Sequence, residues 1–234
     1  MEVLALIPAR GGSKGIKRKN IIPINEKPLL VYSIEHALSS SVIDRVIVST
    51  EDEEIRNIAL KYGAEVPFYR PKELAEDLVP DTPVFKHALE FLDHNENYRP
   101  DIVVHLRPTA PYRKLEWIED TVSLLSHNPG ADSVCTISRV KEHPYRMFSI
   151  TKDGFLDPIM SHEHYRPHIV DRHDLPDIYY YNCIIDVTKP QTVFRKDCTV
   201  GDIIIPYVID ENEVADIDTS ADLKRAETLL RNSV

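Results

Sequence analysis

The sequence lacks the features that mark membrane, secreted or disulfide-bonded proteins. Its longest apolar run, Ile203 to Ile209, is seven residues long and contains Pro206, so it is too short to span a bilayer. Three cysteines without C-x-x-C spacing argue against a disulfide framework and a thiolate metal site. The first residues lack the basic flank and cleavage site of a secretory signal. We therefore expect a cytoplasmic protein with no membrane partner.

Positive charge is also scarce, since 28 lysines and arginines oppose 38 acids for a formal net charge of −10. Most of the surface would repel duplex nucleic acid, so we expect no nucleic-acid partner. Residues 1–27 are the exception, with a local balance of +4 that leaves −14 for the remainder. Positive charge is thus concentrated where a small anion could be held. The cations of this stretch are Arg10, Lys14, Lys17, Arg18, Lys19 and Lys27.

The chain of 234 residues is long enough for one domain with a buried core. Strand-like and helix-like runs alternate through its first two thirds, which is typical of βαβ units around a mostly parallel sheet. The expected strands are 3–8, 45–49, 66–69, 101–106 and 133–140. The expected helices are 28–40, 52–62, 83–93 and 115–126.

The pattern changes after residue 140, where two short strand-like runs flank Asp153-Gly154, a hairpin turn signal. We expect an antiparallel insertion at about 140–185, laid over the sheet as a lobe of a single domain that spans residues 1–234. The expected segments of this part are the strands 147–150, 155–159, 178–187 and 202–209 and a closing helix at 221–230.

Three of only seven glycines, Gly11, Gly12 and Gly15, lie within five residues directly after the first expected strand. Glycine lets backbone N–H groups approach an anion closely, and basic side chains surround this loop. The combination indicates a phosphate-binding loop, with a merely flexible loop of solvated lysines as the alternative. The spacing is neither G-x-G-x-x-G nor G-x-x-x-x-G-K-[ST], which disfavours a dinucleotide fold and a P-loop ATPase.

Five acids lie within nine residues after the last expected strand, with no base between them. In an extended segment, residues two apart point the same way, so Asp216 and Asp218 could hold one Mg²⁺ while Ile217 packs inward. Alternatively, Asp218 or Thr219 caps the last helix and the other acids are solvated. The five acids are Asp210, Glu211, Glu213, Asp216 and Asp218.

Four motifs stand in order along the chain: L-I-P-A-R-G-G-S-K-G at 6–15 followed by Lys19-Asn20, R-P-x-x-L-A-x-D at 70–77, R-P-T-A-P-Y-R at 107–113, and D-I-D-T at 216–219. Together they resemble the CMP-sialic acid synthetase (acylneuraminate cytidylyltransferase) family. The resemblance implies a Rossmann-like α/β nucleotidyltransferase fold, with a mostly parallel sheet, helices on both faces and a small antiparallel dimerisation lobe. It also implies a homodimer that uses CTP and an acidic sugar.

The resemblance further implies roles for individual residues. The implied contacts to the triphosphate are Arg10, Gly11, Gly12, Ser13, Lys14 and Lys19. Asn20 would contact the ribose or base, and Arg70 lies where the family recognises cytosine, with Asp81 or Thr82 as a second candidate. The segment 77–83 departs from the Ser/Thr-rich version that we expect of the family. The candidate catalytic residues are Arg10, Lys19, Asp216 and Asp218, with Mg²⁺ on the last two.

Two further departures lie on the sugar side of the implied site. Arg107 stands where the sialic acid enzymes commonly have Gln, and Asn182-Cys183-Ile184 stands where Asn-Gly-Ala is usual. The carboxylate of an acidic sugar needs its own cation, preferably a planar bidentate one. Arg107, Arg166 and Arg172 are the candidates, with surface ion pairs as the alternative interpretation. Asn182 is a further candidate sugar contact.

The resemblance therefore implies transfer of CMP from CTP to the anomeric hydroxyl of a nonulosonic acid, with release of pyrophosphate. Phosphoryl transfer asks a protein mainly for positioning and charge neutralisation, which the basic loop and a Mg²⁺ would supply. The same chemistry on a Kdo-like acid, a phosphonate or a polyol phosphate is the first alternative. A nucleotide-sugar-dependent glycosyltransferase and a non-catalytic nucleotide sensor are the others.

Overall fold

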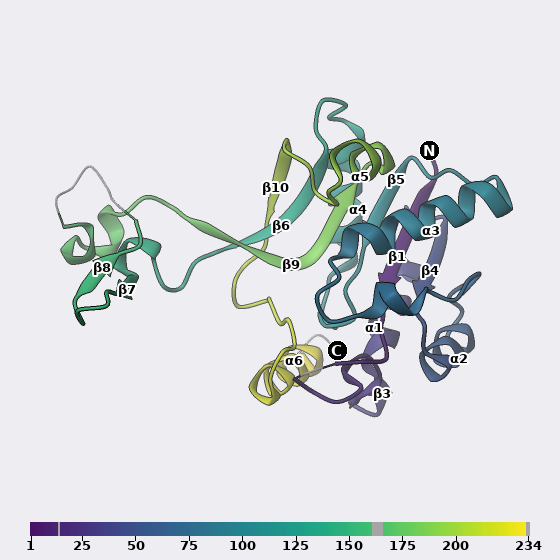
Figure 1. Cartoon of the computed structure of the whole chain (residues 1–234), viewed down its shortest axis with the longest axis horizontal. Coiled ribbons are helices and arrows are strands. Elements are labelled where there is room, and N and C mark those ends of the chain that lie inside the picture. Colours follow the sequence, from purple (N-terminus) through teal and green to yellow (C-terminus); the bar gives the residue numbers. More distant parts are fainter. Residues whose placement is uncertain (14, 161–165, 233–234) are drawn as a thin grey trace.

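The structure, a computed structural model, describes residues 1–13, 15–160 and 166–232, and within them a six-stranded mixed sheet forms the centre of the molecule (Figure 1). The strand order is β10-β6-β9-β5-β1-β4. Neighbouring strands are parallel, except that β9 lies antiparallel between β5 and β6. The strands are β1 (Val3–Pro8), β4 (Arg45–Ser49), β5 (Ile102–His105), β6 (Ser133–Arg139), β9 (Tyr179–Thr188) and β10 (Ile204–Val208). The expected mostly parallel α/β sheet is confirmed.

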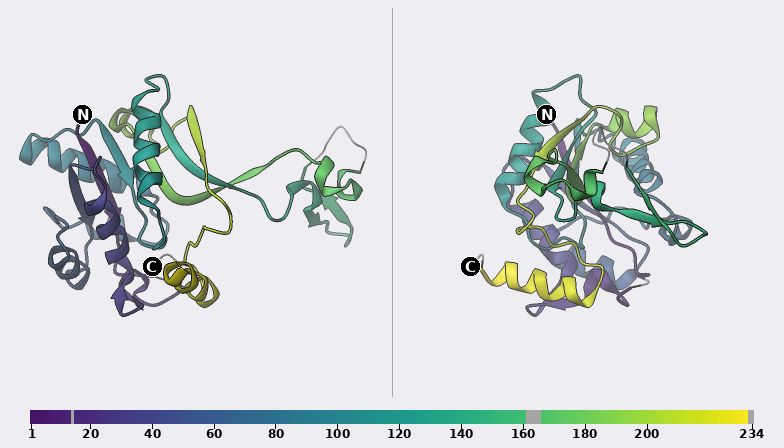
Figure 2. Two further views of the ribbon diagram at one scale, coloured as in Figure 1. Left: turned by 180° about the vertical axis from the view of Figure 1, so that it is seen from behind. Right: turned by 90° about the vertical axis from the view of Figure 1, so that its left-hand side faces the viewer.

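Helices cover both faces of this sheet (Figures 1 and 2). They are α1 (Leu29–Ser39), α2 (Glu53–Lys61), α3 (Asp81–Glu96), α4 (Leu115–Ser126), α5 (Pro190–Lys196) and α6 (Ser220–Asn232). All five expected helices are confirmed, and α3 begins at Asp81 rather than at the expected 83. The sequence pattern does not predict the short α5. None of the helices in the described part of the chain is long and apolar enough to cross a membrane.

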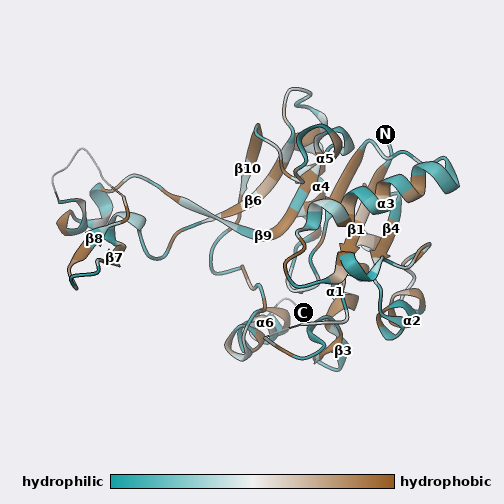
Figure 3. Cartoon of the chain, viewed as in Figure 1, coloured by the Kyte–Doolittle hydropathy of each residue, from teal (hydrophilic) through white to brown (hydrophobic). Residues whose placement is uncertain are grey.

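The side chains of β1 alternate between two apolar clusters, one on each face of the sheet. Val3, Ala5 and Ile7 belong to the cluster that includes residues of α1 and α4, whereas Leu4 and Leu6 belong to the cluster that includes residues of α3. Because both faces are buried, the strand is a continuous apolar run rather than an alternating one. Figure 3 shows the central strands in hydrophobic colours.

The expected strand at 66–69 is wrong. Only an isolated parallel bridge between Ile47 and Glu65 connects this region to β4. Pro67 lies in the middle of the segment and has no N–H group to donate to a ladder. The chain instead returns to the sheet at Arg70, whose backbone N–H donates to Thr50 O at 2.9 Å.

A third apolar cluster joins the beginning of the chain to its C-terminal segment. Ile24 and Leu29 pack in it with Ile217 and Ala226. Ile24 belongs to a two-stranded hairpin of β2 (Pro23–Ile24) and β3 (Lys27–Pro28), which follows the 3₁₀ turn η1 (Lys19–Ile21). The cluster therefore holds the acidic segment beside the glycine-rich loop, although about two hundred residues separate them.

The lobe contains an antiparallel hairpin of β7 (Phe148–Ile150) and β8 (Leu156–Pro158), as the Asp153-Gly154 signal predicts. Among the residues of the lobe that the structure describes, it is accompanied by the 3₁₀ turns η3 (Pro144–Arg146), η4 (Pro167–Ile169) and η5 (Arg172–Asp174).

The expected position of the lobe, laid over the sheet, is wrong. Figures 1 and 2 show it projecting from the sheet at the end of a long two-stranded extension formed by β6 and β9. The pairing of these strands continues out to Arg139 and Tyr179, so the residues from Tyr179 onward belong to the central sheet. Two strands that leave a sheet as a paired ribbon carry the segment between them away from the core.

Candidate active site

A cavity of about 400 Å³ opens where β1 and β5 end at their carboxyl edge. This edge is where ligands bind in open α/β sheets, because loops from neighbouring strands converge there. Of the residues predicted from sequence, those that line it are Arg10, Ser13, Lys19, Asn20, Arg70, Asp81, Arg107 and Asp218. The fold thus gathers side chains from four separate motifs around one hollow.

The glycines of the opening loop serve its packing. The Gly11 N–H donates to Glu51 Oε1 at 2.7 Å, and a Cβ on Gly11 would lie 2.5 Å from Asp52 Oδ2. A Cβ on Gly15 would lie 2.9 Å from the carbonyl oxygen of Asp218. Gly11 and Gly12 are not among the lining residues, and Lys14 lies outside the described residues. Glycine is therefore needed at 11 and 15 because the loop approaches two acidic segments closely.

The basic side chains of the cavity are held by acids of the same chain. Arg10 Nη1 lies 3.0 Å from Asp77 Oδ1. Lys19 Nζ donates to Asp218 Oδ1 at 2.9 Å and to Ile217 O at 2.8 Å. The side chain of Lys19 is 17% exposed and that of Asp218 is 77% exposed, so the cation is fixed while its partner is open to solvent. Such half-exposed pairs are weak and can be exchanged for phosphate oxygens.

Two further lining residues, Asn20 and Arg70, have buried side chains. Asn20 donates from Nδ2 to Arg10 O at 2.9 Å, which ties η1 to the end of β1. Arg70 donates from Nε to Ser49 Oγ at 3.1 Å and from Nη2 to Ser49 O. Burial lowers the pKa of Arg70 to about 10, so its guanidinium remains charged at neutral pH. Arg70 therefore places a fixed positive charge at the end of β4.

The two predicted metal ligands line different hollows. Asp218 lines the main cavity, whereas Asp216 lines a second one of about 240 Å³ with Tyr180, Cys183 and Arg225. Asp216 Oδ1 is buried and has no hydrogen-bond partner among the described residues. An orphaned buried carboxylate oxygen fits a cation ligand. The described residues contain no cluster of three or more acids, histidines and cysteines that could hold a metal, so substrate oxygens would have to complete the coordination.

Thr219 caps the last helix, as the alternative interpretation of this segment predicts. Thr219 Oγ1 accepts a 3.4 Å hydrogen bond from the Asp222 N–H, and Asp222 Oδ2 accepts from the Thr219 N–H at 2.7 Å. This reciprocal pair begins α6 and leaves the carboxylate of Asp218 outside the cap. The cap and a metal site at Asp216 and Asp218 are thus compatible.

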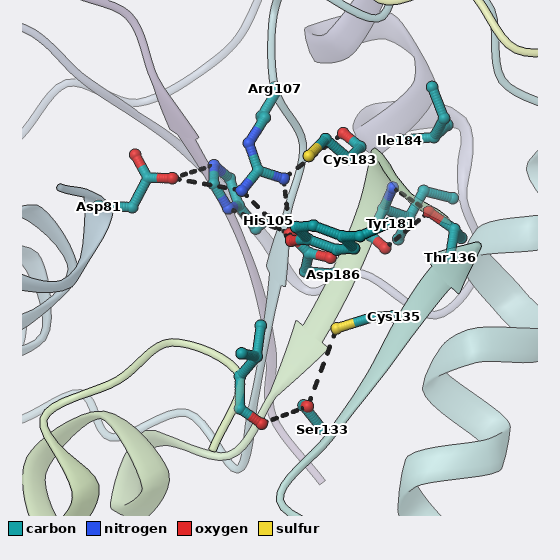
Figure 4. A network of polar contacts seen from close by, with 12 residues as sticks. Asp81, His105, Arg107, Ser133, Cys135, Thr136, Tyr181, Cys183, Ile184 and Asp186 are labelled. Atoms are coloured by element: carbon teal, nitrogen blue, oxygen red, sulfur yellow. Dashed lines mark hydrogen bonds and ion pairs between the residues drawn. The ribbon is translucent and has the colours of Figure 1, made fainter. Parts of the chain in front are cut away.

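A charged network forms the far wall of the cavity (Figure 4). Arg107 Nη1 donates to Asp186 Oδ2 at 2.5 Å, and Nη2 lies 3.3 Å from Asp81 Oδ2. Tyr181 Oη also donates to Asp186 Oδ2, and the Tyr181 ring lies 5.8 Å from the guanidinium carbon. His105 Nδ1 lies 3.7 Å from the same carboxylate oxygen. The cation predicted for the sugar side is therefore already paired within the chain.

The structure does not bring the other predicted sugar contacts to this cavity. Arg166 and Arg172 belong to the projecting lobe, away from the sheet edge (Figure 1). Asn182 is buried, and its amide bonds to Thr136 Oγ1 at 2.6 Å and to Ser138 Oγ at 2.9 Å, so it joins β9 to β6. Thr82 is not among the lining residues.

The backbone conformation of the residue after Asn182 explains why the family usually has glycine at this position. Cys183 has φ of 60°, in the left-handed region that favours glycine. It lies opposite the irregularity between Cys135 and Ile137, where the pairing of β6 with β9 shifts register. The backbone distortion turns the Cys183 carbonyl toward Arg107 Nη1, at 3.4 Å.

Sequence reasoning missed His105, Tyr181 and Asp186. His105 and Asp186 are 1% and 2% exposed, and each interrupts an apolar run of the sequence, at 102–106 and 184–187. A titratable group in a buried strand costs free energy unless it is paired. That interruption is the signal that could have identified both residues.

Comparisons with known proteins agree with this geometry. A family model described as Cytidylyltransferase matches residues 4–210. The chain is 34% identical over 235 residues to pseudaminic acid cytidylyltransferase of Campylobacter jejuni subsp. jejuni serotype O:2, covering 99% of this chain and 97% of that one. It is 32% identical over 232 residues to N-acylneuraminate cytidylyltransferase of Escherichia coli O18:K1:H7, covering 97% of this chain and 52% of that one.

A solved structure of CMP:2-keto-3-deoxy-manno-octonic acid synthetase complexed with CTP matches with a TM-score of 0.72 at 14% identity, over 100% of both chains. At that identity the match establishes the fold. The family model covers the first three motifs, and the two relatives match nearly the whole chain. The chain therefore belongs to the cytidylyltransferase family, of the CMP-sialic acid synthetase type, and is a CTP-dependent nucleotidyltransferase.

Proposed function

We propose that this protein transfers CMP from CTP to the anomeric hydroxyl of a nonulosonic acid and releases pyrophosphate. The observation that carries the proposal is the cavity that gathers Arg10, Lys19, Arg70 and Arg107 in a chain of net charge −10. A cation-lined hollow suits a triphosphate and a sugar carboxylate together. The relatives named for pseudaminic acid and N-acylneuraminate support the same acceptor class.

The chain's own residues would position the nucleotide. Arg10 and Lys19 leave their carboxylate partners for phosphate oxygens, since both pairs are partly exposed. Lys19 also bonds to Ile217 O, so its ammonium stays near the C-terminal segment when Asp218 is released. The sugar hydroxyl then attacks the α-phosphate in line and loses its proton to solvent, while the bond between the α- and β-phosphates breaks and pyrophosphate leaves with its charge neutralised by these cations.

Asp216 and Asp218 would hold a Mg²⁺ ion beside this site. The unpartnered buried oxygen of Asp216 and the exposed carboxylate of Asp218 suit a hard cation that also takes phosphate oxygens. When bound, the ion supplies further charge neutralisation at the phosphates. Release of Asp218 from Lys19 would make both carboxylates available.

Arg107 would bind the acceptor's carboxylate, because it lines the cavity just after β5, whereas the cations of the opening loop are taken up by the triphosphate. Kdo-like acids share this carboxylate and remain the alternative acceptors, with the phosphonate and the polyol phosphate. The family match does not support the glycosyltransferase alternative.

A homodimer is also part of the proposal. The lobe exposes apolar side chains, with Ile150, Phe155 and Ile169 each at least 70% exposed, which a second copy would cover. Arg166 and Arg172 lie on this lobe, so a sugar contact by either would need a second copy. Sedimentation should show a dimer that Phe155→Glu weakens, and a monomeric wild type would contradict this part.

The decisive experiment measures pyrophosphate release from CTP with a panel of acceptors. The panel holds pseudaminic acid, N-acetylneuraminic acid, N,N'-diacetyllegionaminic acid and Kdo, each with and without Mg²⁺. We expect turnover with at least one nonulosonic acid and none with UTP or ATP in place of CTP. No turnover with any nonulosonic acid, or equal rates with UTP, would refute the proposal.

A further inference from the structure

A buried acid lies behind Arg107 in the wall of the cavity. Asp186 is 2% exposed and does not line the hollow itself. Its neighbours on β9, Ile184, Ile185 and Val187, are all fully buried. A carboxylate in such a place costs free energy that only paired partners recover, and an apolar residue would often be at least as stable. A contribution to stability therefore does not explain why this position holds an aspartate.

Arg107 is held unequally at its two terminal nitrogens. Nη1 makes a 2.5 Å hydrogen bond to the buried Asp186. Nη2 makes only long contacts, 3.3 Å to Asp81 Oδ2 and 3.4 Å to Tyr181 Oη, and the side chain of Asp81 is 39% exposed. A short, buried, charge-assisted bond persists, whereas a long contact to an exposed acid is easily replaced. The guanidinium therefore has one anchored and one exchangeable side.

The charges of the cluster restrict what Arg107 can accept. Burial and the nearby Arg107 cation lower the pKa of His105 to about 4, so its imidazole is neutral at neutral pH. Burial by itself lowers the pKa of Arg107. Asp186, and then Tyr181 and Asp81, raise this pKa by more than burial lowers it, so Arg107 stays charged. Arg107 thus faces the two acids Asp81 and Asp186, and two more cations lie close enough to act on these acids, Arg70 on Asp81 and the buried Arg113 on Asp186. Because Asp81 already occupies the Nη2 side, another carboxylate reaches that nitrogen by displacing Asp81.

We propose that Asp186 is a positioning residue for acceptor binding: it anchors Nη1 of Arg107, so that the carboxylate of the acidic sugar takes Nη2 in place of Asp81. This inference rests on the proposed function. Asp186 touches no substrate and acts through Arg107 alone. An anchored guanidinium binds an anion without first losing the freedom of a long side chain, which is the advantage of preorganisation.

Asp186→Asn tests the proposal because it keeps the shape of the side chain and removes its charge. With whichever of pseudaminic acid or N-acetylneuraminic acid the wild type uses better, the acceptor KM should rise at least tenfold. The CTP KM should stay within twofold. An acceptor KM within threefold of wild type, or equal increases in both KM values, would overturn the proposal.

A double variant separates positioning from folding, since Asp186→Asn also leaves Arg107 with one acid fewer. In an Arg107→Gln background, adding Asp186→Asn should change the acceptor KM by less than twofold, because there is no guanidinium left to anchor. A further tenfold increase in that background would show that Asp186 acts independently of Arg107, against the proposal.

Asp132→Asn is the matched control. Asp132 is also a mostly buried acid, and it lies just before β6; its Oδ2 accepts from Lys196 Nζ at 2.7 Å and from the Ile203 N–H at 2.8 Å and makes no contact with Arg107 in the described part of the chain. Its loss should lower the melting temperature and leave both KM values unchanged. If the wild type transfers CMP to no acceptor, the proposed function fails and this inference with it. An active wild type that tolerates Asp186→Asn overturns the inference alone.

Discussion

Lys19→Ala tests whether the opening loop stabilises the transferring phosphate. Two contacts at 2.8 and 2.9 Å hold the ammonium of Lys19 at the cavity wall, and its side chain is only 17% exposed. A cation fixed in this way needs no reorganisation when negative charge develops on the phosphates. Loss of the Lys19 side chain should therefore reduce the stabilisation of the transition state more than it reduces the affinity for CTP.

The expected magnitude follows from the loss of one preorganised charge. Removing such a group costs about 2 to 4 kcal/mol, which corresponds to a kcat lower by about 30- to 900-fold. Arg10 and Arg70 still line the cavity, so the CTP KM should rise by less than about tenfold. The lost hydrogen bond to Ile217 O costs only about 1 kcal/mol of stability, so the variant should fold.

Initial rates of pyrophosphate release at varied CTP give kcat and KM separately. Lys27→Ala is the matched control, because Lys27 belongs to the same basic stretch but pairs with Glu35 and does not line the cavity. Its kcat should stay within twofold of wild type. A raised CTP KM with unchanged kcat in Lys19→Ala would refute the reasoning and make Lys19 a ground-state binder.

Three further predictions address the metal, the core and pH. Asp218→Ala should abolish turnover and leave the melting temperature nearly unchanged, because the side chain is 77% exposed; activity within threefold of wild type at saturating Mg²⁺ would contradict the metal assignment. Phe85→Ala should cost about 3 to 5 kcal/mol in chemical denaturation, since Phe85 is fully buried against His105. The folded-state pKa of His105, about 4, lies below its usual 6.5, so the unfolded chain binds that proton more tightly. The free energy of unfolding should therefore fall by up to about 3 kcal/mol from pH 6.5 to 4, and His105→Gln should make this fall smaller; an unchanged slope would contradict the burial of a neutral His105.

Local pattern was sufficient for most of the sheet and the helices. Val3–Pro8 and the centre of Arg45–Ser49, residues 46–48, are continuous apolar runs because helices cover both faces of the sheet. Leu115–Ser126 has helical periodicity because one of its faces is buried. The same reasoning fails for 66–69, where Pro67 prevents a ladder. It also fails for Pro190–Lys196, which is too short to show a period.

Half of the candidate site is readable in the same way. The opening loop holds Arg10, Ser13 and Lys19 close together in sequence, and all three line the cavity. The pairing of Asp216 with Asp218 on a metal stays a prediction, and the two residues line separate hollows. The sequence alone also predicted the α/β class and the nucleotidyltransferase family.

Only the tertiary structure decided which segments distant in sequence contact each other. Lys19 meets Asp218 because Ile24, Leu29 and Ile217 pack in one apolar cluster, and a lone Lys or Asp in sequence does not name its partner. Arg107 meets Asp186 because β9 pairs antiparallel with β5, an arrangement that depends on which way the chain returns from the lobe. Periodicity shows on which face of a helix or strand a residue lies. The ion-pair partner of a charged residue depends instead on which strand lies opposite, and the packing of the whole sheet decides that.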